Sequence, residues 1–396
     1  MHDLKRIAIV ISHPIQHFCP QYVSFNENPN ITLKVFFAST LGFKKYKDLN
    51  FNQEISWGNL NLDKFDHIFL NGEALLQSDK NLDAPSLENE LSLFKPDVLI
   101  SYGYFQKVQR RAQNWANKNK VHLVFISDSE LKHSRNNFKE FIKFLYLKFY
   151  FLKIDSFLSV GNANEAFYKH YGVKEKNILR MHFPIDIKQY QKSYLNKESL
   201  RNTIREKYSI KENEILLLMV GKLVKWKNHD HIIDAMILLE KEGIYVNLII
   251  LGSGEMKNTW KQKATHLKIS KVFFPGFVSI EELPAYYAAS DMYVHSASLE
   301  PHSIAISEAI SMGCPIILSD KCGSYGETDD VQEGKNGYVF KFGDITELAQ
   351  KIKTLAEDKN KRIAFGNYSH QISKEFQKNA HYTIVENLIE LSENIN

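Results

Sequence analysis

The chain has 396 residues, of which 44% are hydrophobic and 24% are charged, and its formal net charge is +4. This length is too great for one compact core and predicts two domains of ordinary size, with the composition of a globular protein. The mildly basic balance suits anionic substrates or an anionic membrane surface, and it excludes the dense basic patches of a nucleic-acid-binding protein. Three cysteines without disulfide or zinc spacing fit a reducing cytoplasm.

The amino terminus predicts a first strand. Residues 7–11 are five consecutive apolar residues, which is too short for the core of a signal peptide. No other run approaches the ~20 apolar residues of a membrane span. His13 and His17 follow this strand at its carboxyl end and are candidate site residues. A structural role, in which either ring is hydrogen-bonded to backbone, is an equally good interpretation.

Apolar strand-like runs alternate with helical patterns along the whole chain. The predicted strands include residues 7–11, 96–101, 122–127, 215–220, 247–251 and 315–319. Such alternation predicts parallel sheets with crossover helices, hence an α/β protein of doubly wound units. A polar stretch over about 186–211 separates the two sets of strands. We therefore expect a first domain at 1–190, a second at 191–375 and a terminal helix at 376–396.

Two features of the first half have open interpretations. Asp128 follows the strand at 122–127 and either orients a substrate hydroxyl or caps the next helix. The segment 132–153 carries six basic residues, one acid and seven aromatic residues. That mixture suits an interfacial helix on anionic lipid. The alternative, which we slightly favour, is a domain helix with its apolar side packed on the sheet and its lysines in solvent.

In the second half, glycines and lysines follow two predicted strands. The strand at 215–220 runs into Gly221 and Lys222, with Lys227 close behind, and the strand at 247–251 runs into Gly252. A glycine at a strand's carboxyl end lets the backbone approach a ligand, and ligands of open α/β sheets bind there. Each lysine could place an ammonium on a diphosphate, although solvated surface charges remain the alternative.

Glu300 and Glu308 stand eight residues apart in the most informative stretch of the chain. A short strand precedes Glu300, and a helix with Ser303 as N-cap and Gly313 at its end is expected to carry Glu308. The amides of the helix start, which would cradle a phosphate, belong to Ser303, Ile304 and Ala305. Two carboxylates flanking an anion cradle fit a nucleotide-sugar, whereas spacing alone would also fit a solvated pair on a helix edge.

The flanking residues favour the first interpretation, because the run Glu-Pro-x6-Glu-Ala-x3-Gly resembles the signature of retaining GT-B glycosyltransferases of the GT4 family. The resemblance implies that Glu300 contacts the donor sugar and that Glu308 holds the ribose hydroxyls. It also implies that Val278 contacts the donor base through its backbone and that Gly323 belongs to a glycine-rich loop near the donor. Lys222 departs from the usual Arg, which keeps the charge but loses bidentate geometry.

The resemblance implies a GT-B architecture with two Rossmann-like domains facing a cleft and a terminal helix crossing back to the first domain. It implies retaining transfer of a sugar from a nucleotide-sugar to a glycan or lipid-linked acceptor, in envelope polysaccharide or glycolipid synthesis. No Asp-x-Asp motif is present, so we expect neither a metal nor a cofactor. Histidines customary after the strands ending near Ser101 and Ser127 are missing. A sugar-nucleotide epimerase and a non-catalytic sugar-nucleotide binder therefore remain alternatives. We expect a cytoplasmic protein, with peripheral membrane contact left open.

Overall fold

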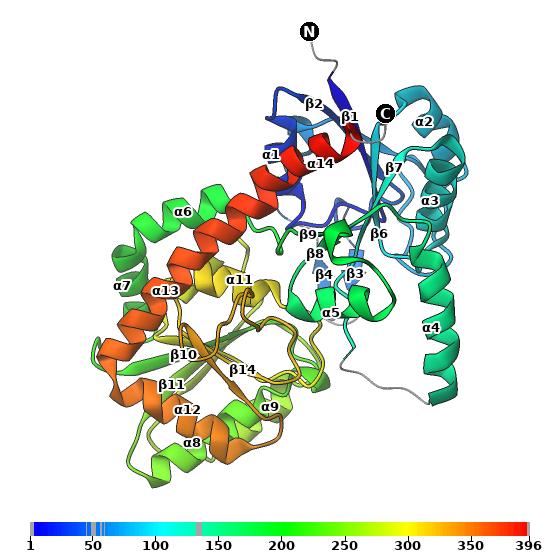
Figure 1. Cartoon of the computed structure of the whole chain (residues 1–396). Coiled ribbons are helices and arrows are strands. Elements are labelled where there is room, and N and C mark those ends of the chain that lie inside the picture. Colours follow the sequence, from blue (N-terminus) through cyan, green and yellow to red (C-terminus); the bar gives the residue numbers. More distant parts are fainter. Residues whose placement is uncertain are drawn as a thin grey trace.

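The computed structural model describes residues 4–44, 46–48, 53–55, 58, 60–131 and 137–393. Over these residues the chain forms two α/β units, each built on a parallel sheet, with a long C-terminal helical segment running past both (Figure 1). The predicted α/β class with two parallel sheets is confirmed. None of the helices in the described ranges is both long and apolar enough to cross a membrane.

The first sheet has seven strands in the order β5-β2-β1-β6-β7-β8-β9. Its strands are β1 (Lys5–Ile11), β2 (Ile31–Phe37), β5 (His67–Phe69), β6 (Val98–Tyr102), β7 (His122–Ile126), β8 (Ser156–Ser159) and β9 (Ile178–Arg180). The helices of this domain are α1 (Cys19–Asn26), α2 (Leu87–Phe94), α3 (Lys107–Asn119), α4 (Asn137–Phe151) and α5 (Asn162–His170). A short antiparallel hairpin, β3 (Tyr46–Asp48) and β4 (Gln53–Ile55), lies apart from this sheet.

The alternating side chains of β1 divide the first domain into two cores. Ile7 and Ile9 pack with α1 and the C-terminal helix, whereas Ala8 and Val10 pack with the helices α2 to α5. A strand buried on both faces needs such a continuous apolar run, because successive side chains point to opposite sides of the sheet. The domain is therefore a three-layer sandwich.

The second sheet has six strands in the order β12-β11-β10-β13-β14-β15. They are β10 (Ile215–Val220), β11 (Val246–Leu251), β12 (Val272–Gly276), β13 (Met292–His295), β14 (Ile316–Ser319) and β15 (Gly337–Phe340). Its helices are α6 (Ile187–Leu195), α7 (Lys197–Lys207), α8 (Asp230–Lys241), α9 (Lys257–Ala264), α10 (Leu283–Ala289), α11 (Ile304–Ser311), α12 (Ile345–Glu357) and α13 (Lys359–Lys378). Three short 3-10 helices cover Leu62–Lys64, Glu175–Asn177 and Lys225–Lys227.

Both sheets have a topological switch point, where the strand order reverses its direction. It lies between β1 and β6 in the first sheet and between β10 and β13 in the second. Ligands of open α/β sheets bind outside the carboxyl ends of the strands at such points. The loops after β1, β10 and β13 are therefore the first places to look for a site.

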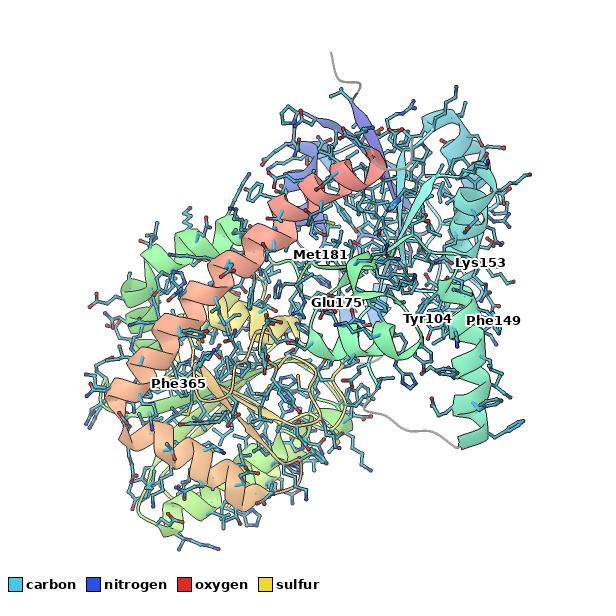
Figure 2. All side chains as sticks on the ribbon, viewed as in Figure 1. Tyr104, Phe149, Lys153, Glu175, Met181 and Phe365 are labelled. Carbon is cyan, nitrogen blue, oxygen red and sulfur yellow. The ribbon has the colours of Figure 1, made fainter. Side chains whose placement is uncertain are left out.

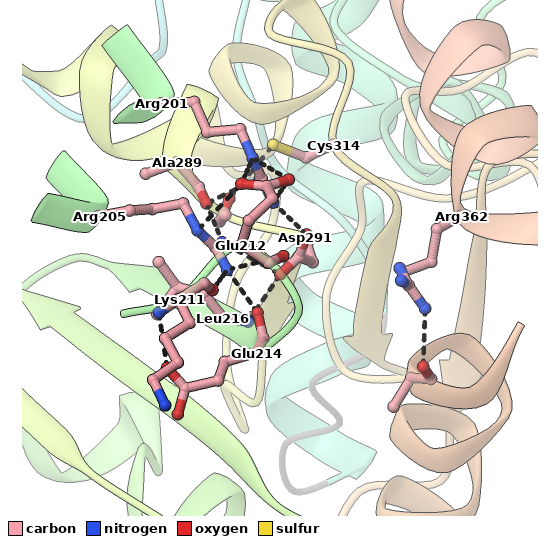
Figure 3. Close-up of polar contacts among 12 residues, drawn as sticks. Arg201, Arg205, Lys211, Glu212, Glu214, Leu216, Ala289, Asp291, Cys314 and Arg362 are labelled. Atoms are coloured by element: carbon pink, nitrogen blue, oxygen red, sulfur yellow. Dashed lines mark hydrogen bonds and ion pairs between the residues drawn. The ribbon is translucent and has the colours of Figure 1, made fainter. Parts of the chain in front are cut away.

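A buried ion network fixes β13 beside β10 (Figure 3). Asp291, just before β13, accepts the backbone N–H of Leu216 in β10 at 2.8 Å. Its carboxylate also pairs with Arg201 at 2.9 Å and with Arg205 at 3.3 Å, both from α7. Arg205 also donates to the carbonyl of Ala289 at the end of α10. Because the buried charges are paired, the network holds the strands that carry the switch point without leaving an isolated charge.

The chain passes between the two domains twice, at neighbouring places. Met181 packs in a first-domain core and Ile185 in the second, and on the return Phe376 packs in the second and Ala380 in the first. A π-helical segment, Asn379–Thr383, joins α13 to the last helix, α14 (Ile384–Glu393), which lies across the first domain (Figure 1).

Hydrogen bonds hold the two crossings together. The side chain of Gln377 accepts the N–H of Ile185 at 3.1 Å and donates to the carbonyl of Phe183 at 3.2 Å. The ring of His182 stacks on Phe376, with centroids 3.8 Å apart. Position 190, where we expected the domain boundary, lies inside α6.

The predicted strands in both halves are confirmed, with ends that differ by one or two residues. The terminal helix was expected at 376–396, but the helical segment already begins with α13 at Lys359, where Asp358 caps it by accepting the N–H of Lys361 at 2.8 Å. The alternative that Asp128 caps the next helix is wrong, since α4 begins at Asn137. Lys132 and Arg135 of the basic aromatic segment lie outside the described residues.

Candidate functional site

The side chains of Lys227 and Glu300 form an ion pair at the second switch point. Lys227 ends the turn that follows β10, and Glu300 lies in the loop that follows β13. Only 15% of the lysine side chain and 16% of the glutamate side chain are exposed. The structure thus brings together two predicted site residues that are 73 positions apart in the chain.

The loop carrying Lys227 is tied to the end of β13. The hydroxyl of Ser296 donates to the carbonyls of Lys227, at 3.2 Å, and Asn228, at 2.8 Å. The amide of Ser298 donates to the carbonyl of Trp226 at 2.8 Å. These bonds bridge the two loops of the switch point and orient the lysine toward Glu300.

Glu300 is held in its ionised form. Burial alone would raise its pKa, but the contact with His295 and the charge of Lys227 outweigh burial and bring the pKa to about 2. His295 Nε2 lies 3.3 Å from the same carboxylate oxygen. Burial lowers the pKa of His295, so its ring is neutral at pH 7. The site therefore presents an ionised carboxylate beside the ammonium group of Lys227.

Glu308 has a different environment, although it belongs to the same motif. It lies in α11, 5% exposed, and accepts a hydrogen bond from the hydroxyl of Tyr287 at 2.8 Å. Burial raises its pKa to about 7, and the hydroxyls of Tyr287 and Tyr190 offset this only in part. A contact between Glu308 and ribose hydroxyls stays a prediction.

The start of α11 offers fewer donors than expected. The amide of Ser303 already donates to the hydroxyl of Ser324 at 2.8 Å, so it is not available to a phosphate in this structure. The backbone of Ser303 is extended, as in an N-cap residue, but its side chain makes no capping bond. The N–H groups of Ile304 and Ala305 occupy the first two positions of the helix, where no intrahelical acceptor exists. These two amides remain the predicted anion cradle.

Two of the predicted glycines serve backbone packing beneath the site. A Cβ on Gly252 would collide with the carbonyl of Gly221, and its φ of +132° also favours glycine. A Cβ on Gly323 would collide with the carbonyl of Pro301, and the amide of Gly323 donates to the carbonyl of Glu300 at 2.8 Å. Both glycines thus support the switch-point loops, and their contact with a donor stays a prediction.

Gly221 and Val278 are half-buried beyond the carboxyl ends of β10 and β12. A Cβ on Gly221 would lie 3.8 Å from Cε of Lys227, so this glycine borders the ion pair. Lys222 is half-buried directly after Gly221. Val278 is half-buried two residues beyond the end of β12, and it packs against the second core. The structure therefore clusters most of the predicted donor residues around the carboxyl ends of β10 to β13.

Asp128 approaches this cluster from the first domain. Its side chain is solvent-accessible, although surrounding protein raises its pKa by desolvation, with the charge of His302 opposing and that of Glu300 adding to the rise. Glu130 lies against Gly323 of the second domain. The end of β7 therefore faces the loops after β13 and β14, and a role of Asp128 toward an acceptor stays a prediction.

His13 and His17 lie at the first switch point, after β1. Burial lowers the pKa of His13 to about 4 and that of His17 to about 3, so both rings are neutral at pH 7. His13 Nδ1 lies 2.8 Å from the hydroxyl of Ser12. The ring of His17 packs on Phe183 at 5.5 Å, and Phe183 packs on His302 of the second domain at 5.1 Å. Both histidines therefore stay site candidates at the domain junction.

Sequence reasoning missed a buried charged cluster at this junction. His302 Nε2 lies 3.2 Å from Asp330, and Asp329 accepts the N–H of Asn162 at 2.6 Å, at the start of α5 in the first domain. Burial lowers the pKa of His302, but the bond to Asp330 and the charges of both aspartates outweigh burial and raise it. The adjacent Asp329-Asp330 pair in the sequence was the one signal that could have indicated it.

The same three side chains are the metal-ligand group that we find among the described residues. One ligand atom from each lies within 4.8 Å of the others. Each is already engaged, since Asp330 also accepts the hydroxyl of Ser307 at 2.6 Å. These contacts describe an internal charge network, and metal independence stays a prediction.

Comparison with known proteins agrees with this geometry. Residues 201–372 match the family described as glycosyl transferases group 1. An uncharacterised glycosyltransferase of Methanocaldococcus jannaschii is 29% identical over 231 residues, 58% of this chain and 56% of that protein. The alpha-monoglucosyldiacylglycerol synthase of Streptococcus pneumoniae is 26% identical over 211 residues, 49% of this chain and 47% of that enzyme. The aligned segments thus span about half the length of these curated relatives.

Solved structures match over almost the whole chain. A glycosyltransferase from Rickettsia africae has a TM-score of 0.71 at 15% identity, covering 99% of this chain and 98% of its own. The UDP complex of HepE from Anabaena has a TM-score of 0.69 at 16% identity, covering 99% of this chain and 100% of its own. At this identity the structural matches establish the fold. Residues 201–372 thus match the glycosyl transferases group 1 family, GT4, and the two domains of the chain have the GT-B fold.

Proposed function

We propose that the chain is a retaining glycosyltransferase that moves a sugar from a nucleotide-sugar to an acceptor hydroxyl. The observation that carries the proposal is the Lys227–Glu300 ion pair at the β10/β13 switch point, beside the start of α11. A fixed cation and helix-start amides stabilise a departing diphosphate, and a fixed carboxylate accepts hydroxyls of the donor sugar.

Each group has a defined task in this proposal. Lys227 and Lys222 neutralise the diphosphate, together with the amides of Ile304 and Ala305. Glu300 orients the donor sugar, and Glu308 holds the ribose. Such preorganised charges cost no reorganisation when the leaving group develops its charge, so they act on the transition state more than on bound substrate.

The transfer step needs no dedicated protein base. The bond between the anomeric carbon and the diphosphate oxygen breaks, while the acceptor oxygen bonds to that carbon on the same face. The acceptor proton passes to the departing phosphate oxygen. Asp128, which faces Glu300 and His302 from the first domain, orients the acceptor, with His13 and His17 nearby.

The names of the relatives support a glycan or lipid-linked acceptor in envelope polysaccharide or glycolipid synthesis. They include the alpha-monoglucosyldiacylglycerol synthase of Streptococcus pneumoniae. They also include a poly(glycerol-phosphate) alpha-glucosyltransferase of Bacillus subtilis, which is 26% identical over 162 residues. An enzyme acting on such acceptors works at a membrane surface. Peripheral contact with the membrane is therefore part of the proposal.

A thermal-shift panel of UDP-, GDP-, ADP- and CMP-sugars tests the donor site, because a ligand that binds only the folded state must raise the Tm. We expect one nucleotide series to raise it, and UDP-sugars come first because HepE of Anabaena holds UDP. The absence of a shift with every series would contradict the proposal.

Turnover then separates the proposal from its alternatives. The binding donor is incubated with and without a panel of glycan and lipid acceptors. Transfer of the sugar to an acceptor supports the proposal. Conversion of the donor to an isomer without acceptor would show an epimerase, and binding without any turnover would show a non-catalytic protein.

A further inference from the structure

Helix α4 has two apolar faces, and the first domain covers only one of them. The inner face packs through Phe144, Leu147, Tyr150 and Phe151, with Leu147 completely buried. The interpretation of the segment as a domain helix packed on the sheet therefore describes this face correctly and leaves the opposite one unexplained.

The opposite face is an exposed apolar stripe. Phe138 is 71% exposed, Phe149 64% and Leu152 75%. The outer stripe comprises Phe138, Phe141, Ile142, Leu145, Phe149 and Leu152, all exposed. At helical spacing these positions fall within a band about 100° wide. Monomeric proteins rarely expose such a contiguous apolar surface to solvent.

Lysines border the outer stripe. Lys139 and Lys153 lie on one side of it at helical spacing and Lys148 on the other, and all three are exposed. Lys143 instead lies on the inner side, over the rings of Phe167 and Tyr171. The single acid of α4, Glu140, is half-buried toward the domain. The exposed half of the helix thus has apolar and cationic groups and no acid.

We propose that the outer stripe of α4 docks the protein on an anionic lipid bilayer. Apolar side chains enter the boundary between headgroups and acyl chains, and the bordering lysines meet anionic headgroups. A second copy of the chain is a poorer occupant. Two such helices would bring lysine against lysine with no acid to pair, although the spacing 138-142-145-149-152 is that of a coiled-coil seam.

The position of α4 suits the acceptor named above. It is the helix after β7, the strand whose end carries Asp128, and it forms an outer edge of the first domain, where Phe149 and Lys153 are marked (Figure 2). Docking through α4 would hold the acceptor side of the site at the membrane. This link to a lipid-linked acceptor rests on the proposed function, whereas bilayer binding itself does not.

Co-sedimentation of the full chain with vesicles tests the docking. We expect binding to vesicles of phosphatidylcholine with phosphatidylglycerol at low salt, little binding to phosphatidylcholine alone, and release by added salt as charges are screened. Replacing Lys139, Lys148 and Lys153 with Gln should weaken binding about a hundredfold. The control replaces Lys118, Lys241 and Lys268, which are exposed elsewhere, and should change it much less.

A matched pair of apolar variants tests the stripe itself. Phe141→Gln with Phe149→Gln should weaken binding at least about tenfold, since each removes a large apolar group from the lipid. Leu93→Gln with Leu195→Gln removes apolar groups that are 78% and 86% exposed elsewhere, and should leave binding unchanged. Equal loss in both pairs would contradict docking through α4.

A fluorescent label locates the contact. The three native cysteines are buried, so Cys introduced at Phe149 or at Leu195 takes an environment-sensitive dye selectively. We expect a blue shift on vesicle addition only at position 149. Absence of vesicle binding, or a concentration-dependent dimer that the Phe141 and Phe149 changes abolish, would overturn the proposal. Sugar-nucleotide binding, measured without vesicles, would survive that failure and so tests the proposed function separately.

Discussion

The loop that carries Glu300 and the helix that carries Glu308 shift the pKa of the same type of side chain in opposite directions. Glu300 pairs with Lys227 and its pKa falls to about 2, whereas Glu308 is buried beside tyrosine hydroxyls and its pKa rises to about 7. Eight residues separate the two carboxylates. The environment, and not the residue type or the motif, therefore decides which one carries a permanent charge.

This difference assigns the two carboxylates different tasks. A permanent charge suits a group that must act in the transition state, because its state does not depend on pH near neutrality. A carboxyl that titrates near neutrality suits a group whose charge is stabilised by ligand hydroxyls. The predictions below test these tasks, beginning with the largest expected effect.

Lys227→Ala should lower kcat by roughly 100-fold or more and raise KM much less, because it removes a cation from the developing charge of the diphosphate. Steady-state kinetics with the identified donor gives both constants. Lys225→Ala, in the same turn but with an exposed lysine, is the control and should be near normal. Normal turnover of the Lys227 variant would place this lysine outside the chemistry.

Glu308→Ala should weaken donor binding by roughly ten- to a hundredfold, since hydrogen bonds to a charged group contribute about 1.5–3 kcal/mol. Calorimetry with the sugar nucleotide and with its nucleoside diphosphate measures the loss. Glu308→Gln keeps a hydrogen-bond acceptor for the hydroxyl of Tyr287, and it serves as the control in case the Ala variant misfolds. Unchanged affinity in a folded variant would remove Glu308 from the site and make it a structural partner of Tyr287.

Nucleotide affinity should rise about tenfold between pH 6 and pH 8, because ribose hydroxyls donate to the ionised form of Glu308 and its pKa is about 7. Glu308→Gln should remove this dependence. In the free protein the pH dependence of folding stability has the opposite sign, because a raised pKa means that the folded state is favoured when Glu308 is protonated. Stability from this group is present below pH ~4.5 and is lost as pH rises toward 7. A flat affinity profile for the native chain would contradict ligand contact.

Lys222→Arg should change kcat and KM by less than about twofold, because it preserves the charge and restores the residue usual in the resembling family. Lys222→Gln should reduce kcat more than the Arg change does, and comparison of the two variants measures the charge alone. A severe loss in the Arg variant would mean that the compact ammonium of Lys222 fills a space too small for a guanidinium.

Much of the fold could be predicted because its signals are local. The continuous apolar run of β10 predicted the bounds of this strand, Ile215–Val220. Ser303 and Gly313 predicted the start and end of α11, and in the structure the backbone is extended at Ser303 and φ is positive at Gly313. Lys227 and Glu300 could each be singled out as site residues because each follows the carboxyl end of a strand, but their ion pair was not predicted. These features depend on the chain's own neighbours or on the order of the strands.

The remaining site features depend on side chains brought together by tertiary packing. The bond from Ser303 to Ser324 and the bond from Tyr287 to Glu308 each join residues 21 positions apart. No periodicity indicates either bond. The outer stripe of α4 was hidden for a similar reason, because the sequence shows apolar residues on two faces and only the packing shows which face is covered.

The paired crossings between the domains have a mechanical consequence. In the part of the chain that the structure describes, the backbone passes between the cores only beside Ile185 and Gln377, which are bonded to each other, so the two halves share a single pivot. Relative rotation must bend the backbone there, next to the π-helical turn that begins at Asn379. The hydrogen bond from the N–H of Asn162 to Asp329 would have to break before any large rotation of the domains. We therefore expect the two domains to move relative to each other by rotation about the paired crossings.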